Sequence, residues 1–404
     1  SWSVVPTDGK SPLPLGWHAT VSLNRKLYVF GGVYEGLYTN RLVCLNTVGK
    51  HFLWQQPVVK GSIPCARAGH TLTVVGKRNC YLIGGRDASG NCLSDVYFFH
   101  TGATDDVLIW NKVNSSGDIP PPMHGHAAVA IDRQLVIFGG SLQDGTQSQD
   151  LYILNTSSLQ WSRIALGGAV PSPRYGHTMN VLGDKIMVFG GMSEGDLKND
   201  FYYLNLETMA WEQVEASSTA PPARMFHAAD VVSNKLFIYG GKSEDSGSMS
   251  DCYCFDAENR TWTHGDLKTP GPKSRFAHTF TTMNAWVYVI GGFDLSGVSL
   301  TRVHALFVVG WYRNLLKGPT TETETVQPSG STIKKSLRSE SPSIRLHAQM
   351  DALTSTPGSK AELSWRPSSA SKSARKRANP SSPQLTQRQL AQRFPGASPS
   401  QSAT

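Results

Sequence analysis

The chain has 404 residues, and its 38 Lys and Arg exceed its 30 Asp and Glu, which gives a formal net charge of +8. Twelve of the basic residues but only five of the acidic ones follow Lys317, so the residues before Gly318 are almost neutral. The overall charge therefore gives no reason to assign nucleic-acid binding to the part of the chain before Gly318.

Cysteine usage and hydropathy indicate the cellular environment. The six cysteines form no C-x-x-C pair and no zinc-site spacing, and a domain of this size needs no disulfides. The sequence contains no run of 18 apolar residues, and no charged and then apolar leader opens it. These observations predict an intracellular protein without a membrane partner, in the cytoplasm or in the nucleus.

The first set of predicted elements is a group of four short strands. His18 opens the first strand, and the polar turn 24–25 connects it to the apolar run LYVF at 27–30. The pair Gly31-Gly32 ends this second strand, a polar loop and a third strand follow, and Trp54 begins the fourth strand. The short turns predict that neighbouring strands are antiparallel.

The same elements recur six times with nearly constant spacing. The paired glycines, 50 to 55 residues apart, are Gly31-Gly32, Gly84-Gly85, Gly139-Gly140, Gly190-Gly191, Gly240-Gly241 and Gly291-Gly292. A histidine precedes each pair by 13 or 14 residues: His18, His70, His126, His177, His227 and His278. A tryptophan stands 16 residues before each histidine: Trp2, Trp54, Trp110, Trp161, Trp211 and Trp262. Because one four-stranded sheet cannot bury both faces, six such units are expected to stack around an axis.

The third strand has its own recurring start in four of the six repeats. These starts are Asp95-Val96-Tyr97, Asp150-Leu151-Tyr152, Asp200-Phe201-Tyr202 and Asp251-Cys252-Tyr253. The first and last repeats depart from the pattern, with Asn40-Arg41-Leu42 and Thr301-Arg302-Val303 at this step. The departures weaken the prediction of those two strands but leave the number of repeats unchanged.

A repeat with a double glycine, a Tyr and a Trp resembles the kelch repeat, and the match covers residues 1–317. The resemblance implies an all-β fold, a six-bladed kelch β-propeller, with the tryptophans packed between blades. Kelch proteins act as adaptors, cytoskeletal binders or substrate receptors of ubiquitin ligases, so the resemblance implies a protein–protein interaction module. No BTB or F-box pattern is present to choose among these roles.

The ring is expected to close through the N-terminal strand. Residues 2–5 have the pattern of a fourth strand, but no first three strands precede them. Trp311 competes for the same place, but Asn314 follows it where the pattern requires an apolar residue. We therefore predict that Trp2 and its neighbours complete the last blade, which removes an exposed sheet edge.

Catalytic, cofactor and metal motifs are missing from the sequence. The recurring histidines are expected to be hydrogen-bonded framework groups, and Cys252 and Cys254 to be small apolar residues on one face of a strand. There is no G-x-G-x-x-G, P-loop or H-E-x-x-H motif. Some kelch-like propellers are enzymes or enzyme partners, such as copper oxidases and nitrile-specifier proteins, but the E-x-x-x-D-x-x-x-H pattern of the latter is absent. We expect no enzyme and no cofactor.

Residues 318–404 form the second predicted region, a disordered basic tail rich in Ser and Pro. The cluster at 372–377 has the composition of a nuclear-localisation or anionic-surface segment, and equally of a solvated charge run. Residues 382–394 could form a short helix on a partner. The alternative function is therefore binding of nucleic acid or an anionic surface through the tail.

The candidate binding face lies where the loops after the glycine pairs meet the segments that lead into the histidines. The predicted partner-binding residues are Glu35, Arg67, Asp87, Asp144, Arg174, Glu194, Asp196, Arg224, Glu244, Asp245, Arg275 and Asp294. The excess of acidic residues predicts a partner with a basic segment, and the basic tail could itself dock there. The four arginines, three residues before a repeat histidine, could instead pair with the aspartates that open the third strands.

Overall fold

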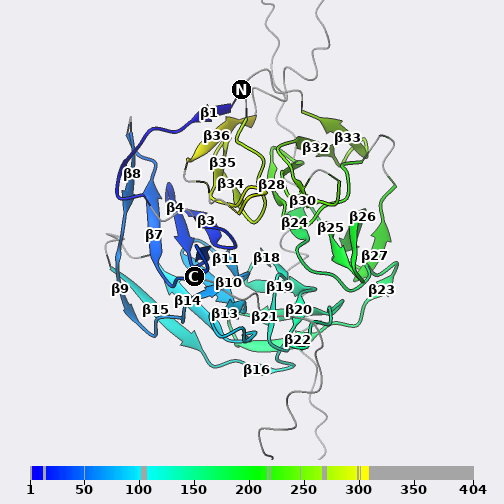
Figure 1. Cartoon of the computed structure of the whole chain (residues 1–404). Coiled ribbons are helices and arrows are strands. Elements are labelled where there is room, and N and C mark those ends of the chain that lie inside the picture. Colours follow the sequence, from blue (N-terminus) through cyan, green and yellow to red (C-terminus); the bar gives the residue numbers. More distant parts are fainter. Residues whose placement is uncertain are drawn as a thin grey trace, which may run out of the picture. The chain divides into compact units, whose positions relative to one another are not determined.

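The computed structural model is a ring of six β-sheets arranged around an axis (Figure 1). It describes residues 2–11, 15–49, 51–101, 107–215, 218, 220–245, 247–265, 271–297, 300 and 302–308. The chain divides into two units, Ser1–Thr356 and Pro357–Thr404, and every described residue belongs to the first. All regular elements among the described residues are strands, so the predicted all-β, six-bladed propeller is confirmed.

Each blade contains four antiparallel strands, and the first strands of neighbouring blades contact one another around the axis. Blade 1 consists of β3 (Ala19–Leu23), β4 (Lys26–Phe30), β7 (Leu42–Asn46) and β8 (Phe52–Gln55). Blade 2 consists of β11 (Thr71–Val75), β12 (Asn79–Ile83), β14 (Val96–His100) and β15 (Val107–Val113). Blade 3 consists of β18 (Ala127–Ile131), β19 (Gln134–Phe138), β21 (Leu151–Asn155) and β22 (Gln160–Arg163).

The remaining three blades follow the same plan. Blade 4 consists of β24 (Thr178–Leu182), β25 (Lys185–Ser193), β26 (Asp196–Asn205) and β27 (Ala210–Gln213). Blade 5 consists of β28 (Ala228–Val232), β29 (Lys235–Tyr239), β32 (Cys252–Asp256) and β33 (Thr261–His264). Blade 6 consists of β34 (Thr279–Met283), β35 (Trp286–Ile290), β36 (His304–Phe307) and β1 (Trp2–Val4). The third strands of blades 1 and 6 are thus present despite their departures from the repeat.

Crossover segments add a fifth strand to four of the blades, which the sequence analysis did not predict. They pair in parallel with the outermost strand of the next blade and are β2 (Thr7–Gly9), β9 (Val58–Gly61), β16 (Ser116–Gly117) and β23 (Gly167–Gly168). A Cβ on Gly168, whose φ is +73°, would lie 2.1 Å from the carbonyl oxygen of Trp211. The close approach of the crossover to the outer strand therefore requires glycine at this position.

Two of the polar turns between first and second strands have positive φ at both central residues. Asn24 and Arg25 have φ values of 50° and 59°, and Ser233 and Asn234 have values of 48° and 64°. Hairpins of two residues need such angles because their turn must match the right-handed twist of the strands.

Contacts between the histidines and the glycines explain why the two recur together. A Cβ on Gly31 of blade 1 would lie 2.6 Å from Cε1 of His70 in blade 2. The same contact spans the ring closure, where a Cβ on Gly291 would lie 2.6 Å from Cε1 of His18. The first glycine of each pair thus makes room for the imidazole of the next blade.

The hydrophobic core is divided among the six interfaces between neighbouring blades, and each repeat tryptophan lies in one of them. Trp110 of blade 2, for example, packs against Phe30 of blade 1 with 5.1 Å between ring centroids. Trp2 packs edge-to-face on Tyr239 of blade 5 at 5.2 Å. The prediction that the tryptophans anchor the blade interfaces is confirmed.

The N-terminal strand closes the ring, as predicted. In blade 6, β1 pairs antiparallel with β36, with Trp2 opposite Leu306 and Val4 opposite His304. The amide of Val5 extends the pairing by donating to the carbonyl of Val303 at 2.9 Å. Figure 1 shows β1 lying beside β36 at the top of the ring.

Several predictions concern residues that the structure does not describe. The competing Trp311, the disordered tail at 318–404, the basic cluster at 372–377 and the short helix at 382–394 all lie outside the described residues. In the part of the chain that the structure does describe, no helix is long and apolar enough to cross a membrane. Cys252 and Cys254 are buried and unpaired, and burial raises the pKa of both thiols, which fits their predicted role as small apolar residues.

Candidate functional site

The loops after the glycine pairs and the segments that lead into the histidines meet at one end of the strands, as expected from the strand order. Short hairpins follow the glycine pairs and include β5 (Val33–Tyr34), β6 (Leu37–Tyr38), β13 (Arg86–Asp87), β20 (Ser141–Leu142), β30 (Lys242–Ser243) and β31 (Gly247–Ser248). Two of them pair with the segments that lead into the histidines, β10 (Arg67–Ala68) and β17 (Met123–His124). Isolated bridges such as Tyr175 with Met192 make the same connection in the other blades. We call this side of the propeller the loop face.

A closed ring of six backbone hydrogen bonds surrounds the axis on the loop face. It joins the residues that directly precede the repeat histidines: Trp17, Gly69, Gly125, Gly176, Phe226 and Ala277. Each amide donates to the carbonyl of its counterpart in the preceding blade at 2.8 to 3.0 Å, and the amide of Trp17 closes the ring on Ala277. All six have φ between 51° and 67°. For Trp17 and Phe226 this backbone conformation is unfavourable, so the surrounding ring must hold it in place.

Aromatic side chains gather around this ring, in a group that we call the mouth cluster. Its members are Trp17, His124, Tyr175, Phe226, Phe276 and Phe293. Their ring centroids lie 5.0 to 6.3 Å apart in a continuous chain of contacts from His124 to Phe293. All except Phe293 are half-buried, so they present aromatic surface at the end of the axis. The hollow there has a volume of about 130 Å³, with Trp17, Phe226 and the six histidines among its lining residues.

The histidines below this hollow are buried and neutral. Burial lowers the pKa of His18 to about 4 and the pKa values of His126 and His177 to about 3. His126 Nε2 lies 3.0 Å from the hydroxyl of Thr71 in the preceding blade, and His227 makes the equivalent contact with Thr178 at 2.9 Å. These contacts fit the predicted hydrogen-bonded framework role for His126 and His227, whereas the ring nitrogens of His70, His177 and His278 have no such partner among the described residues. Among the described residues, no group of three or more His, Cys, Asp or Glu side chains could hold a metal ion.

Acidic side chains surround the mouth cluster on the outer loops. Glu35, Asp144, Glu194, Asp196, Glu244 and Asp245 are exposed, and Asp87 and Asp294 are partly buried. Some of them stabilise their own turns: Asp87 accepts hydrogen bonds from the amides of Ser89 and Asn91, and these contacts lower its pKa. Asp144 and Asp294 accept bonds from Thr146 and Ser296 in the same way. The exposed acids of blades 4 and 5 have no such turn contact among the described residues, apart from an ion pair of Asp196 with Lys198 at 3.3 Å.

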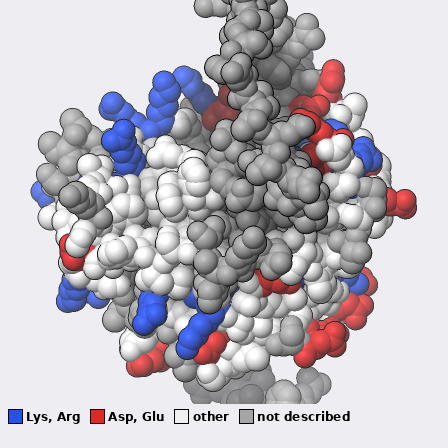
Figure 2. Space-filling model, turned by 90° about the horizontal axis from the view of Figure 1, so that it is seen from above, with Lys and Arg blue, Asp and Glu red and all other residues white. Residues whose placement is uncertain are grey.

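Figure 2 shows how charge is distributed on one side of the ring. Lys and Arg side chains gather at the upper left of this view, and Asp and Glu side chains gather at its lower right. Elsewhere in this view, as along its lower left edge, side chains of both charges are mixed.

Three of the predicted site arginines are framework residues. Arg67, Arg174 and Arg224 are fully buried, and their guanidinium groups bind Asp95, Asp200 and Asp251 through two hydrogen bonds each, at 2.5 to 3.0 Å. The alternative that these arginines pair with the third-strand aspartates is thus confirmed in blades 2, 4 and 5. Because an internal carboxylate already occupies each guanidinium, we do not retain these three arginines as partner-binding residues.

A tyrosine completes each of these pairs. The guanidinium carbon of Arg67 lies 5.5 Å from the ring centroid of Tyr97, and Tyr202 and Tyr253 have the same relation to Arg174 and Arg224 at 5.4 and 5.5 Å. We call this Arg, Asp and Tyr arrangement the triad. In blade 2, burial works to lower the pKa of Arg67, but the bonds to Asp95 outweigh it and raise the pKa.

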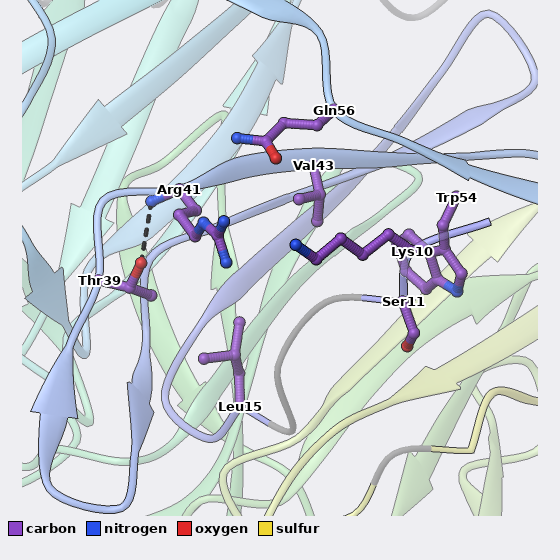
Figure 3. Close-up of a pocket in the computed structure, with 8 residues that line it drawn as sticks. All are labelled: Lys10, Ser11, Leu15, Thr39, Arg41, Val43, Trp54 and Gln56. Atoms are coloured by element: carbon purple, nitrogen blue, oxygen red, sulfur yellow. Dashed lines mark hydrogen bonds between the residues drawn. The ribbon is translucent and has the colours of Figure 1, made fainter.

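Blades 1 and 3 lack the triad, and each has a pocket at its position. In blade 3 the arginine is replaced by Met123, and Asp150 pairs instead with Arg163 at 2.6 Å beside a cavity of about 610 Å³. In blade 1, Leu15, Arg41 and Val43 stand at the three triad positions and line a smaller cavity of about 50 Å³. Figure 3 shows the charged ends of Lys10 and Arg41 pointing toward each other in this cavity.

Blade 6 retains the triad arginine, Arg275, but lacks its carboxylate. The register of β35 and β36 places Arg302 at the position of the aspartate and His304 at the position of the tyrosine. Arg275 keeps the two backbone contacts that its counterparts make, donating to the carbonyl of Lys273 at 3.0 Å and to that of Gly291 at 2.8 Å. Burial lowers the pKa of this arginine to about 10.

Sequence reasoning missed the mouth cluster. Its residues stand one or two places before a repeat histidine, except for Phe293, which follows the second glycine of its pair. They share no common residue type, so the repeat pattern alone does not mark them. Comparing this position across the repeats would have shown aromatic residues at Trp17, Tyr175, Phe226 and Phe276.

Comparison with protein families gives one match that covers most of the chain. The family model described as the KLHDC2/KLHL20/DRC7 Kelch-repeats domain matches residues 1–106, 69–292 and 197–330. Among solved structures, that of YjhT is similar, with a TM-score of 0.60 and 18% sequence identity over 76% of this chain and 98% of that one. At this identity the likeness concerns the fold alone.

Several curated proteins are similar to parts of the chain. A Rho GTPase-activating protein, gacHH, of Dictyostelium discoideum is 38% identical over 127 residues, which are 30% of this chain and 8% of that protein. Host cell factor 1 of Homo sapiens is 32% identical over 208 residues, which are 47% of this chain and 10% of that protein. The host cell factor homolog hcf-1 of Caenorhabditis elegans is 32% identical over 209 residues, which are 47% of this chain and 26% of that protein. The alignments thus span about a quarter or less of the length of these relatives.

Proposed function

Because this chain belongs to the kelch-repeat family, we propose that it is a protein-interaction module that binds a segment of another protein on the loop face. The observation that carries the proposal is the mouth cluster, a group of half-buried aromatic rings surrounded by exposed acidic loops. Aromatic side chains bury much area at low entropic cost and dominate the energetics of interfaces. The face therefore combines an apolar centre with a charged rim, as protein interfaces do.

The acidic rim favours a partner with a basic segment. Glu194, Asp196, Glu244 and Asp245 lie on loops of neighbouring blades 4 and 5, and Tyr175 and Phe226 of the mouth cluster precede the first strands of the same two blades. Opposite charges at the rim mainly raise the association rate, while the aromatic centre contributes most of the binding free energy. Lys and Arg side chains can also bind over aromatic faces.

The basic tail of the same chain is an internal candidate for this site. Residues 366–388 carry six basic and no acidic side chains. A tethered segment acts at an effective concentration of about a millimolar, so even a weak contact could compete with an external partner. In the alternative function the tail itself would bind nucleic acid, and its affinity would then fall steeply as salt is raised, whereas the propeller without the tail would not bind.

Charge reversal on the loop face tests the proposal. A fluorescent peptide with the sequence of residues 366–388 serves as a basic probe, and affinity purification on the chain truncated at residue 317, followed by mass spectrometry, identifies external partners. Replacing Glu194, Asp196, Glu244 and Asp245 with Lys should abolish the binding of both. The melting temperature should stay nearly unchanged, because these side chains are exposed.

A matched pair of double variants controls for net charge. Glu194→Lys with Glu244→Lys changes the loop face, and Asp184→Lys with Glu258→Lys makes the same charge change in exposed turns at the opposite ends of the strands. Only the first pair should weaken binding. Equal loss in both variants would mean that net charge, rather than the loop face, governs binding.

A further inference from the structure

The triad position of blade 6 holds a buried arginine without a carboxylate. Arg275 is 1% exposed, as deeply buried as Arg67, Arg174 and Arg224, and it occupies the same place relative to its histidine and its glycine pair. Its counterparts each bind an aspartate with side-chain distances of 2.5 to 2.7 Å for the shorter bond. Among the described residues no Asp or Glu oxygen lies within ion-pair distance of Arg275.

The chain does not supply the missing carboxylate from the loop before the third strand. Between Asp294 and His304 the sequence is LSGVSLTRV, which contains no acidic residue. Asp294 itself accepts hydrogen bonds from Ser296 within the hairpin turn. The aspartate position is held by Arg302, whose side chain is exposed, so a second cation stands where a carboxylate stands in blades 2, 4 and 5.

A buried guanidinium without a counter-charge is costly, because desolvation is not offset by an ion pair. The two carbonyl bonds of Arg275 satisfy only part of its five N–H groups. In the complete triads the same two carbonyl contacts fix the guanidinium so that its outer edge receives both carboxylate oxygens. Arg275 is therefore oriented for a carboxylate that the described residues do not provide.

In the complete triads the carboxylate position is open to solvent on the loop face. The aspartates of the complete triads are 20 to 22% exposed although their arginines are fully buried. A carboxylate that approached blade 6 from solvent could thus reach the corresponding place. Burial, and then the nearby guanidinium of Arg275, lower the imidazole pKa of His304, which replaces the triad tyrosine, to about 4.

The neighbouring blade adds further positive charge to this sector. The amide of Gly292, which follows the Gly291 that holds Arg275, donates to the carbonyl of Leu15 at 2.8 Å. Leu15 lines the blade 1 cavity with Lys10 and Arg41, whose charged ends point toward each other in Figure 3. None of the eight lining residues of that cavity is acidic.

We propose that the triad position of blade 6 is a carboxylate-binding site, in which a Glu or Asp side chain of a protein partner pairs with Arg275. The planar, two-oxygen geometry of a carboxylate matches the guanidinium edge, as the three complete triads demonstrate within the same chain. Arg302 and the cations of blade 1 steer the anion toward the site.

This inference deepens the proposed function and rests on it for the identity of the partner as a protein. It adds to the loop face a cationic site, formed by Arg275 and Arg302 of blade 6 with Lys10 and Arg41 of blade 1 nearby, besides the exposed acids of blades 4 and 5. A partner segment that crosses the mouth cluster would place basic residues over these acids and an acidic residue in the cationic site. The tests below need no partner, so their failure is distinct from failure of the proposed function.

The first test restores the missing aspartate. Arg302→Asp should complete a triad-like pair with Arg275 and raise the Tm of the full chain by about 3 °C relative to Arg302→Asn. The Asn variant is the matched control, because it removes the same arginine and has the same shape without the charge. Equal Tm values for the two variants would overturn the proposal, since Arg275 would then lack nothing that a carboxylate supplies.

The second test uses acetate as the probe. At equal ionic strength, sodium acetate should raise the Tm of the wild-type chain more than sodium chloride does, and the difference should disappear in Arg302→Asp, where the site is filled. It should also disappear in Arg275→Met, a residue that the equivalent position of blade 3 accommodates as Met123. Acetate should shift the His304 imidazole pKa upward in NMR titrations, because the added anion offsets the charge of Arg275.

Three outcomes would count against the site. Equal stabilisation by chloride and acetate would mean that only a nonspecific anion effect exists. An acetate effect that persists in Arg275→Met would place the anion elsewhere. An unchanged His304 titration alongside an acetate effect would separate the anion from the blade 6 position.

Discussion

Blades 2, 4 and 5 share a buried ion pair that blades 1, 3 and 6 lack in three different ways. Blade 1 has other residues at all three triad positions, blade 3 lacks only the arginine, and blade 6 contains the arginine but neither of its two partners. The strand pairing of the six blades is nevertheless the same. The triad therefore stabilises individual blades without specifying the fold.

The contacts that all six blades keep are those between neighbours. Each repeat histidine packs against the glycine pair of the preceding blade, and each tryptophan lies in an interface core. These groups join neighbouring blades, whereas the triad joins strands within one blade. The ring therefore depends on them at all six interfaces. The triad position is free to vary, and pockets occur at it in blades 1 and 3.

Acidification should have the largest effect on the unfolding free energy, because it protonates the buried histidines that all six blades share. Burial holds the pKa of His126 and His177 at about 3 and that of His18 at about 4, below the unfolded value of 6.5. The unfolded chain therefore binds more protons, so stability is complete above pH 6.5 and falls as the pH approaches the folded values. Each buried histidine should cost about 1.4 kcal/mol per pH unit in this window. Denaturant unfolding at a series of pH values measures the slope, which should be less steep in His177→Asn.

Blade 6 also differs from the other blades because it contains both the first and the last described strand of the chain, β1 and β36. Removal of residues 1–6 takes away β1 and the buried Trp2, which should lower the unfolding free energy by up to about 5 kcal/mol. Thermal melting of the truncated chain tests this. A Trp2→Ala variant isolates the side chain, and if both proteins melted at the wild-type temperature, closure by β1 would not stabilise the ring.

Removing the aspartate should cost more stability in a complete triad than in an incomplete one. Asp200→Ala leaves the fully buried Arg174 without a counter-charge and should cost about 3 to 5 kcal/mol. Asp150→Ala in blade 3 removes a pair whose arginine, Arg163, is 60% exposed, and should cost about 1 kcal/mol or less. Urea unfolding of the two variants gives the comparison. Similar losses at both positions would mean that burial of the arginine does not distinguish the blades.

The smallest change in unfolding free energy is expected when an arginine is introduced at the triad position of blade 3. Met123→Arg in blade 3 offers Asp150 the partner that its counterparts have, but it also exchanges apolar packing for a desolvated charge. Because these contributions nearly cancel, the unfolding free energy should change by less than about 1 kcal/mol. Urea midpoints of this variant and wild type measure the change. A large gain would show that the triad is worth more than the packing it replaces.

Much of the fold could be predicted because each blade repeats the same local geometry. The glycine pairs, His18 and its five counterparts, and the tryptophans recur at fixed distances, since each marks a strand end or an interface that every blade must build. The closure by Trp2 followed from an unpaired fourth-strand pattern. The parallel crossover strands were missed because two or three residues such as Gly167–Gly168 have no periodicity to detect.

The candidate site was predicted less completely. The sequence indicated which loops meet on one face and that they carry acids such as Glu194 and Glu244, because strand order alone fixes where loops emerge. It gave two alternatives for the arginines, and burial decided between them: Arg67, Arg174 and Arg224 have internal partners, whereas Arg275 has none among the described residues.

The sequence by itself determined the number of blades, their boundaries and the way the ring closes. Only the tertiary structure brought Trp17, Tyr175, Phe226 and Phe276 into one cluster and left Arg275 beside Arg302 and His304. The physical reason is that repeat spacing reflects interactions each blade makes in the same way. A binding site depends on the residues at which the blades differ, and these meet only when the ring is closed.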